Sequence, residues 1–167
     1  MIQAIVYTSN TGYTQRYAQM LAQQTGLPLY DLEQASASLA AGAEIFYFGW
    51  LMAGRIQGYG KAARAFRVGC AIAVGMAPDG ALIEAVRQRN ALPPELPVFS
   101  LQGGYERSRV KGIYGFMMDM LVRKMTRDQK KTTPTEADRQ MLQLMRDGGD
   151  WVRPEALAPV LDWFRAQ

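Results

Sequence analysis

Residues 4–14 are Ala4-Ile5-Val6-Tyr7-Thr8-Ser9-Asn10-Thr11-Gly12-Tyr13-Thr14, and they contain the first boundary between a strand and a helix. The first five of them are apolar or β-branched, which predicts a buried strand. After a polar loop, apolar residues recur three and four positions apart, at Tyr17, Met20 and Leu21, and Gly26 marks a helix end. The segment is therefore predicted to be a strand, a short polar loop and a helix.

The same alternation continues along the chain. Four more apolar runs predict strands at residues 28–32, 43–50, 69–75 and 97–101, and segments with helical character separate them. The runs 43–50 and 69–75 are uninterrupted, as in strands buried on both faces of a parallel sheet. A last helix is predicted over residues 155–164. We therefore predict an open α/β sheet of five strands, with ligands bound at the carboxyl ends of the strands.

Composition narrows the class of protein. The 167 residues, 49% apolar and 20% charged, are typical of one globular domain, and no apolar run reaches the roughly 20 residues of a membrane span. There is no histidine and one cysteine, Cys70, which excludes histidine-dependent catalysis, imidazole-bound metals, an internal disulfide and a thiolate zinc cluster. We expect no catalytic side chain and no metal ligand, so enzyme chemistry would come from a cofactor. The opening residues lack an export pattern, and we expect a cytoplasmic protein.

The loop after the first strand has the composition of a phosphate-binding site. It offers the hydroxyls of Thr8, Ser9, Thr11 and Thr14, the amide of Asn10, and backbone N–H groups near Gly12. A helix N-terminus attracts anions because its first N–H groups lack partners and its dipole is positive there. The loop contains no Lys or Arg, which separates it from a P-loop and favours a single monophosphate. The alternative is that these residues only cap the helix.

The six residues Ser9-Asn10-Thr11-Gly12-Tyr13-Thr14 resemble the first loop of the flavodoxin family, where Ser/Thr-x-Thr-Gly-x-Thr follows strand one. The resemblance covers about residues 2–102. It implies a three-layer α/β/α fold with a five-stranded parallel sheet in the order 2-1-3-4-5. It also implies bound FMN, with Thr8 to Thr14, Tyr13 included, as cofactor-binding residues.

In flavodoxin-like proteins, two further loops after strands three and four border the flavin ring. The corresponding residues in this chain are Trp50, Leu51, Met52, Ala53 and Gly54 in the first loop and Gly75, Met76 and Ala77 in the second. Gly54 permits close backbone approach to a flat ring, whereas Trp50 either packs near the ring or ends its strand as a core residue. The second loop lacks the stacking aromatic residue and the Gly-Asp of many family members, and Tyr105 is a candidate substitute.

Residues 103–150 are predicted to be a helical elaboration of the single domain. Residues 105–131 contain eight basic and three acidic side chains, a local net charge of +5 in a chain whose total is +4. A helical stripe of Tyr114, Met117, Met118, Leu121 and Met125 is widened by Ile113, Phe116 and Met120. This stripe either packs against the sheet or is an exposed surface for a lipid-like, porphyrin-like or protein partner. Residues 112–125 are also similar, less specifically, to menaquinone-dependent protoporphyrinogen dehydrogenases.

These features predict an FMN-binding oxidoreductase or electron-transfer protein. Its partner would be a redox protein or a bulky apolar substrate, bound through Tyr105 to Lys131, with peripheral contact to the inner face of an anionic membrane as a further option. The basic segment contains few aromatic residues and no nucleic-acid motif, so no nucleic-acid partner is expected. Two alternatives stay open: a protoporphyrinogen-dehydrogenase-like flavoenzyme at the membrane surface, and a flavin-free interaction scaffold.

Overall fold

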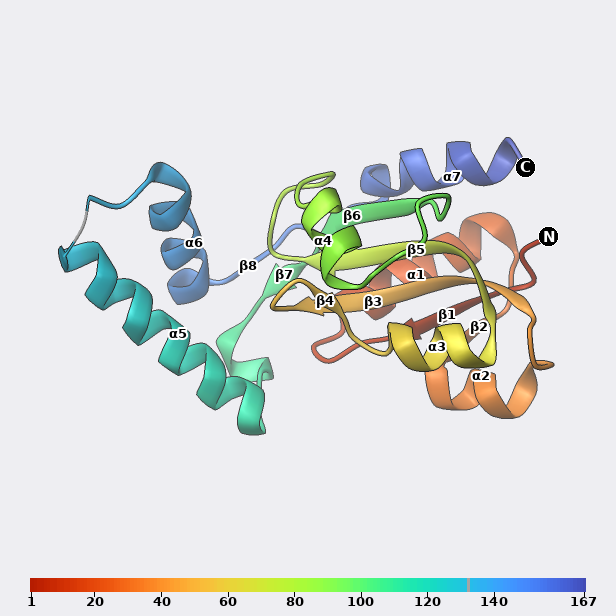
Figure 1. Cartoon of the computed structure of the whole chain (residues 1–167), viewed down its shortest axis with the longest axis horizontal. Helices are drawn as coiled ribbons and strands as arrows, with labels where there is room; N and C mark the ends of the chain where they lie inside the picture. Colours follow the sequence, from red (N-terminus) through yellow and green to blue (C-terminus); the bar gives the residue numbers. More distant parts are fainter. Residues whose placement is uncertain (132) are drawn as a thin grey trace. The chain divides into compact units, whose positions relative to one another are not determined.

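The structure is a computed structural model that describes residues 1–131 and 133–167 (Figure 1). The chain forms two compact units. The first consists of Met1–Gly103 and Val152–Gln167, and the second of Gly104–Trp151.

A mostly parallel sheet forms the centre of the first unit. Five parallel strands lie in the spatial order β2-β1-β3-β5-β6, and β4 pairs with β3 in the antiparallel direction. The strands are β1 (Ala4–Thr8), β2 (Leu29–Asp31), β3 (Glu44–Met52), β4 (Arg55–Ile56), β5 (Arg67–Gly75) and β6 (Val98–Gln102).

The predicted α/β sheet is confirmed, but the strand count differs. The sheet has six strands rather than five because the chain turns back after β3 and adds β4. Two residues carry no periodic signal, so β4 was not predicted. When β4 is set aside, the parallel strands follow the expected order 2-1-3-4-5 along the chain.

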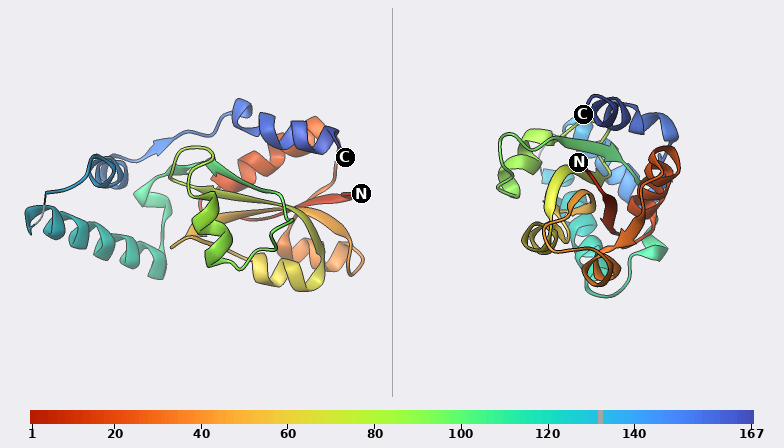
Figure 2. Two further views of the ribbon diagram at one scale, coloured as in Figure 1. Left: turned by 45° about the horizontal axis from the view of Figure 1, so that its top comes forward. Right: turned by 90° about the vertical axis from the view of Figure 1, so that its right-hand side faces the viewer.

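Helices cover both faces of this sheet, as Figure 2 shows. On one side lie α1 and α7, the latter preceded by the 3-10 helix η2, and on the other lie α2, α3 and α4. Their bounds are α1 (Tyr13–Thr25), α2 (Leu32–Ser38), α3 (Tyr59–Ala65), α4 (Ile83–Arg89), η2 (Pro154–Leu157) and α7 (Ala158–Arg165). The sheet is therefore the middle of three layers.

The core divides into two clusters because successive strand residues point to opposite faces. Phe46 belongs to the cluster beneath Leu21 of α1 and Val160 of α7. Its neighbour Tyr47 belongs to the cluster beneath Ala62 of α3. Both faces are buried, which explains why the strands were recognisable as uninterrupted apolar runs.

The second unit consists of two helices between short paired strands. Strand β7 (Gly104–Tyr105) pairs antiparallel with β8 (Gly149–Asp150), and between them lie the 3-10 helix η1 (Arg107–Arg109), α5 (Gly112–Lys131) and α6 (Glu136–Asp147). Thr135 and Asp138 cap the start of α6 through a reciprocal pair of side-chain bonds. Among the residues described, no helix combines the length and apolar character needed to cross a membrane.

The apolar residues of α5 do not form one buried stripe. Met118 is buried, and Tyr114 and Met125 are half-buried, whereas Met117 and Leu121 are exposed, as are the flanking Ile113, Phe116 and Met120. Helix α5 packs with α6, and Thr126 Oγ1 accepts a hydrogen bond from Arg146 at 3.1 Å. The interpretation that the whole stripe is packed is therefore wrong for Met117 and Leu121, and the alternative of an exposed surface for a partner stays a prediction.

Candidate functional site

Three candidate loops follow neighbouring parallel strands, and the strand register brings them together. Thr8, the last residue of β1, pairs with Gly49 of β3, and Trp50 of β3 pairs with Val74 of β5. Parallel strands end at the same edge of a sheet. The β1–α1 loop, the β3–β4 turn and the loop after β5 therefore share the carboxyl edge of this sheet.

The β1–α1 loop leaves the start of α1 accessible. Gly12 has a φ of 97°, and apart from its two chain neighbours no described residue has an atom within 4 Å of the place where its Cβ would stand. The backbone N–H of Gly12 donates to Ser9 Oγ at 3.1 Å, which closes a turn of the loop just before the helix. Among the described residues, no side chain caps α1 at Gly12, and the first turn contains no acidic residue. A positive helix end with space above it is a suitable place for an anion.

Thr8 has a structural partner at the base of this loop. Its Oγ1 lies 2.8 Å from the hydroxyl of Tyr47, which donates to the carbonyl of Gln57 at 2.7 Å. Since the single proton of Tyr47 is directed to Gln57, the Thr8 hydroxyl donates to Tyr47. Burial raises the pKa of Tyr47 to about 12, so the chain of bonds is intact at neutral pH. Thr8 therefore holds the loop to β3. The side chains that follow it, Ser9, Asn10 and Thr11, are also half-buried or exposed.

The other two predicted loop residues lie inside the fold. Tyr13 is buried, and Thr14 has an exposed fraction of 2%. Both belong to the first turn of α1, where their backbone N–H groups are at the positive end of the helix. Tyr13 and Thr14 are therefore placed to donate backbone N–H groups to an anion at this helix start, whereas their buried side chains are not placed to contact it.

The β3–β4 hairpin contains all five residues predicted after strand three. Trp50 is half-buried, and β3 continues beyond it to Met52, so the alternative that Trp50 ends its strand is wrong. Ala53 and Gly54 form the turn with φ values of 50° and 75°, as in hairpins of two central residues. Leu51 reaches the second loop, because a Cβ on Gly75 would lie 3.0 Å from a Leu51 methyl group. The two candidate ring loops are therefore in contact.

Asn90, which was not predicted as a site residue, anchors this turn. Its side-chain amide donates to the carbonyls of Gly54 at 2.9 Å and Val86 at 2.7 Å, and its Oδ1 accepts the N–H of Ile56 at 2.9 Å. The sequence marks Asn90 only as a helix end. Its contact with a turn 36 residues earlier is visible only in the folded chain.

The loop after β5 is anchored by Asp79 and Gln102, which the sequence also did not reveal. Asp79 accepts the backbone N–H of Gln102 at 2.7 Å and forms an ion pair with Arg153. The side chain of Gln102 donates to the carbonyl of Met76 at 2.9 Å. The neighbours of Asp79 in the chain, Pro78 and Gly80, predict a turn. Its ion-pair partner Arg153 comes 74 residues later, so the sequence does not predict the pair. These bonds hold residues 75–77 in place.

Tyr105, the candidate substitute for the missing stacking residue, belongs to β7 in the second unit. It is buried, and burial raises the pKa of its hydroxyl. That hydroxyl has no hydrogen-bond partner among the residues that the structure describes.

Reactive side chains are scarce in both units. Cys70 is fully buried, and burial raises the pKa of its thiol, which keeps it protonated. Among the described residues, no group of three or more carboxylate or thiol side chains is placed to hold a metal ion. The arrangement therefore offers neutral hydrogen-bond donors and loop backbone.

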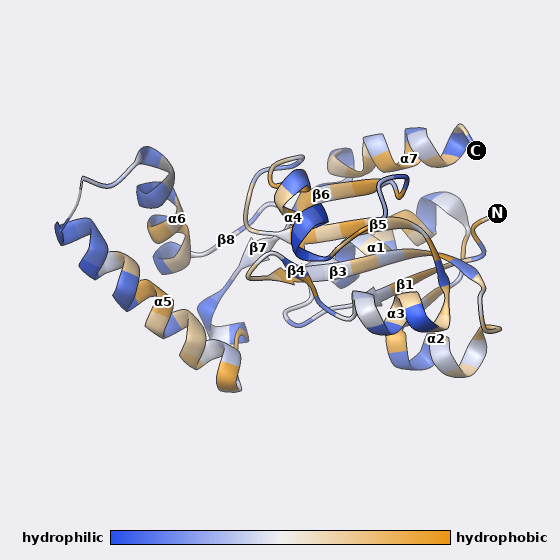
Figure 3. Cartoon of the chain, in the orientation of Figure 1, coloured by the Kyte–Doolittle hydropathy of each residue, from blue (hydrophilic) through white to orange (hydrophobic). Residues whose placement is uncertain are grey.

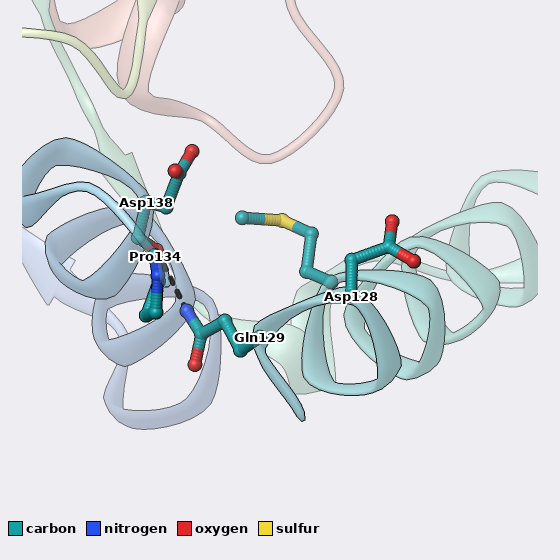
Figure 4. Close-up of a pocket in the computed structure, with 5 residues that line it drawn as sticks. Asp128, Gln129, Pro134 and Asp138 are labelled. Atoms are coloured by element: carbon teal, nitrogen blue, oxygen red, sulfur yellow. Dashed lines mark hydrogen bonds between the residues drawn. The ribbon is translucent and has the colours of Figure 1, made fainter. Parts of the chain in front are cut away.

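A small pocket lies between α5 and α6 (Figure 4). Its volume is about 140 Å³, and it is lined by Met125, Asp128, Gln129, Pro134 and Asp138. The amide of Gln129 donates across it to the carbonyl of Asp138 at 3.3 Å. Typical small-molecule sites have about 300 Å³ or more. This pocket is too small for a flavin, and it belongs to a different unit from the three loops.

No known protein family, characterised protein or solved structure matches the chain.

Proposed function

We infer that the protein is a flavodoxin-like oxidoreductase or electron carrier that binds FMN at the carboxyl edge of its sheet. The observation that carries this proposal is the β1–α1 loop, where an uncapped helix start stands beneath open space at Gly12. The motif Ser9-Asn10-Thr11-Gly12-Tyr13-Thr14 occupies this position. Motif and geometry, two separate properties of the chain, thus agree on an anion site.

The donors of this loop suit one phosphate monoester. Ser9 and Thr11 supply hydroxyls, Asn10 supplies an amide, and the first turn of α1 supplies backbone N–H groups. Neutral donors and a helix dipole bind an anion without a fixed cation. A triphosphate with Mg²⁺ would require a lysine in the loop, and none is present.

The β3–β4 hairpin and residues 75–77 would border the ring. FMN would supply the redox chemistry when bound. The protein would hold the ring between Trp50 to Gly54 and Gly75 to Ala77, which Leu51 already joins. Asn90 and Asp79 would keep these two loops in place through the bonds described above. No side chain is required as a general acid or base.

FMN titration of the purified protein tests the proposal. Absorbance in the flavin region is followed during titration, and gel filtration then shows whether the flavin elutes with the protein. The informative variant is Thr11→Asp, which places a carboxylate in the phosphate loop. Thr11→Asn is the matched control, because the asparagine side chain has nearly the same shape as aspartate but no charge.

We expect Thr11→Asp to weaken FMN binding by about 100-fold or more, since like charges about 4 Å apart near a protein surface repel by several kcal/mol. Thr11→Asn should change affinity much less. Circular dichroism verifies that both variants are folded. If the wild-type protein retains its fold but no flavin, or if the two variants bind FMN equally, this loop is not an FMN phosphate site.

A further inference from the structure

Helix α5 presents an outward face on which apolar residues are followed by basic ones, with the exposed Asp128 at its edge. Ile113, Met117, Met120, Lys124, Arg127 and Lys131 follow one another at spacings of three or four, and all six are exposed. Such spacing places side chains on one face of a helix. The opposite face contains Met118, Val122 and Met125, which are buried or half-buried.

This outward face changes character along the helix. Its first half is apolar: Ile113 is 70% exposed, Phe116 beside it 64%, and Met120 55%. Its second half is basic, with Lys124, Arg127 and Lys131 on the same face. Figure 3 shows the change, because α5 is hydrophobic at the Gly112 end and hydrophilic at the Lys131 end. Large apolar side chains that are exposed and lie next to one another indicate a binding surface.

We propose that this face of α5 docks on an anionic lipid surface. Ile113, Phe116 and Met120 enter the boundary between headgroups and acyl chains, and the following basic side chains contact phosphate headgroups. The unbranched methionine chains fit an irregular acyl environment. A bilayer surface offers apolar and anionic partners side by side, which is the combination that this helix presents.

Charge argues against a second copy of the chain as the occupant. Residues 105–131 have a net charge of +5, so two such faces would repel each other. The ion pairs Arg107–Asp119 and Arg109–Glu106 satisfy the acidic side chains near the start of the segment. The basic side chains at the end of α5 remain exposed to meet an anionic partner.

The test is cosedimentation of the full chain with vesicles. Phosphatidylglycerol vesicles are compared with phosphatidylcholine vesicles at low salt and at about 0.5 M salt, where charge interactions are screened. The apolar variant is Phe116→Gln with Met120→Gln, since glutamine is a good helix former. Its control is Leu82→Gln in the first unit, where Leu82 is 55% exposed, like Met120.

The charge variant is Lys124→Gln with Arg127→Gln. Its control is Lys61→Gln with Arg64→Gln on α3, which removes the same two residue types at the same spacing from another exposed helix face. None of these substitutions touches the candidate flavin loops, and vesicle binding is measured without FMN. The outcome is therefore independent of the proposed function.

We expect wild-type protein to bind phosphatidylglycerol vesicles at low salt and to be released at high salt. The charge variant should bind about 30-fold more weakly. The apolar variant should lose about 10-fold or more, while both controls bind like wild type. Wild-type protein that ignores anionic vesicles overturns the proposal and favours an acidic protein as partner. Controls that lose as much binding as the α5 variants also overturn it.

Discussion

Replacing Asn90 with alanine should loosen the β3–β4 turn. The substitution removes two hydrogen bonds that the amide donates, to Gly54 and Val86, and one that it accepts from Ile56. Asn90 has a φ of −105°, which alanine adopts without strain. The effect therefore comes from the lost bonds rather than from the backbone.

The loss of stability depends on whether each group that loses a hydrogen bond is buried or can still bond elsewhere. Ile56 is 4% exposed, so its N–H group loses its partner in a buried place, at a cost of about 1 to 3 kcal/mol. The carbonyl of Val86 still accepts the backbone N–H of residue 90, and Gly54 is only half-buried. These two bonds add about 0.5 kcal/mol each. The sum is about 2 to 4 kcal/mol.

Urea unfolding followed by circular dichroism measures this difference. With an m-value of about 2 kcal/mol/M, the midpoint should fall by about 1 to 2 M. Hydrogen exchange gives a local reading, because the Ile56 amide should lose protection. Gln88→Ala is the control: Gln88 is exposed on the same helix, and its replacement should change stability by less than about 0.5 kcal/mol.

The reasoning fails if Asn90→Ala unfolds at the same urea concentration as Gln88→Ala. It also fails if the Ile56 amide exchanges at an unchanged rate. Either result would mean that the turn is held by its own Ala53-Gly54 conformation. If the turn borders FMN as proposed, the same variant should bind FMN more weakly.

Two further predictions concern buried titratable groups. The pKa of Tyr47 is raised from 10.0 to about 12, so its stabilising contribution is complete below pH 10 and is lost as pH rises from 10 towards 12. The tyrosinate absorbance of wild type minus that of Tyr47→Phe should titrate near 12, and a midpoint near 10 would contradict the buried hydrogen bonds. Cys70, whose thiol pKa is raised by burial, should resist an aromatic disulfide reagent at about pH 8 until urea unfolds the chain. Labelling of native protein as fast as unfolded protein would place Cys70 outside the core.

The central strands and their helices could be predicted because each carries a local signal. The run before Trp50 is apolar on both faces, and β3 is indeed buried from Ile45 to Gly49. The break between β1 and α1 is equally local, since polar residues and Gly12 separate the two patterns. Strand β4 carries no such signal, because two residues are too few to show a period.

The anchors of the candidate loops could not be predicted, because each joins residues far apart in the chain. Asn90 meets Gly54 across 36 positions, and Asp79 meets Arg153 across 74. A polar residue in a sequence shows its donors and acceptors but not their partners. Thr8 is similar: its place in the loop predicts a phosphate donor, but the sequence does not show that its hydroxyl lies against Tyr47.

The sequence by itself determined the alternation of strands and helices, the charge of residues 105–131 and the neutral hydrogen-bond donors of the first loop. These are properties of neighbouring residues, and the local chain carries them. Only the tertiary structure decided which loops share an edge of the sheet, which bonds hold them and which side of α5 is left open. Those depend on contacts between distant segments, since a helical period identifies the faces of α5 but not the face that α6 covers.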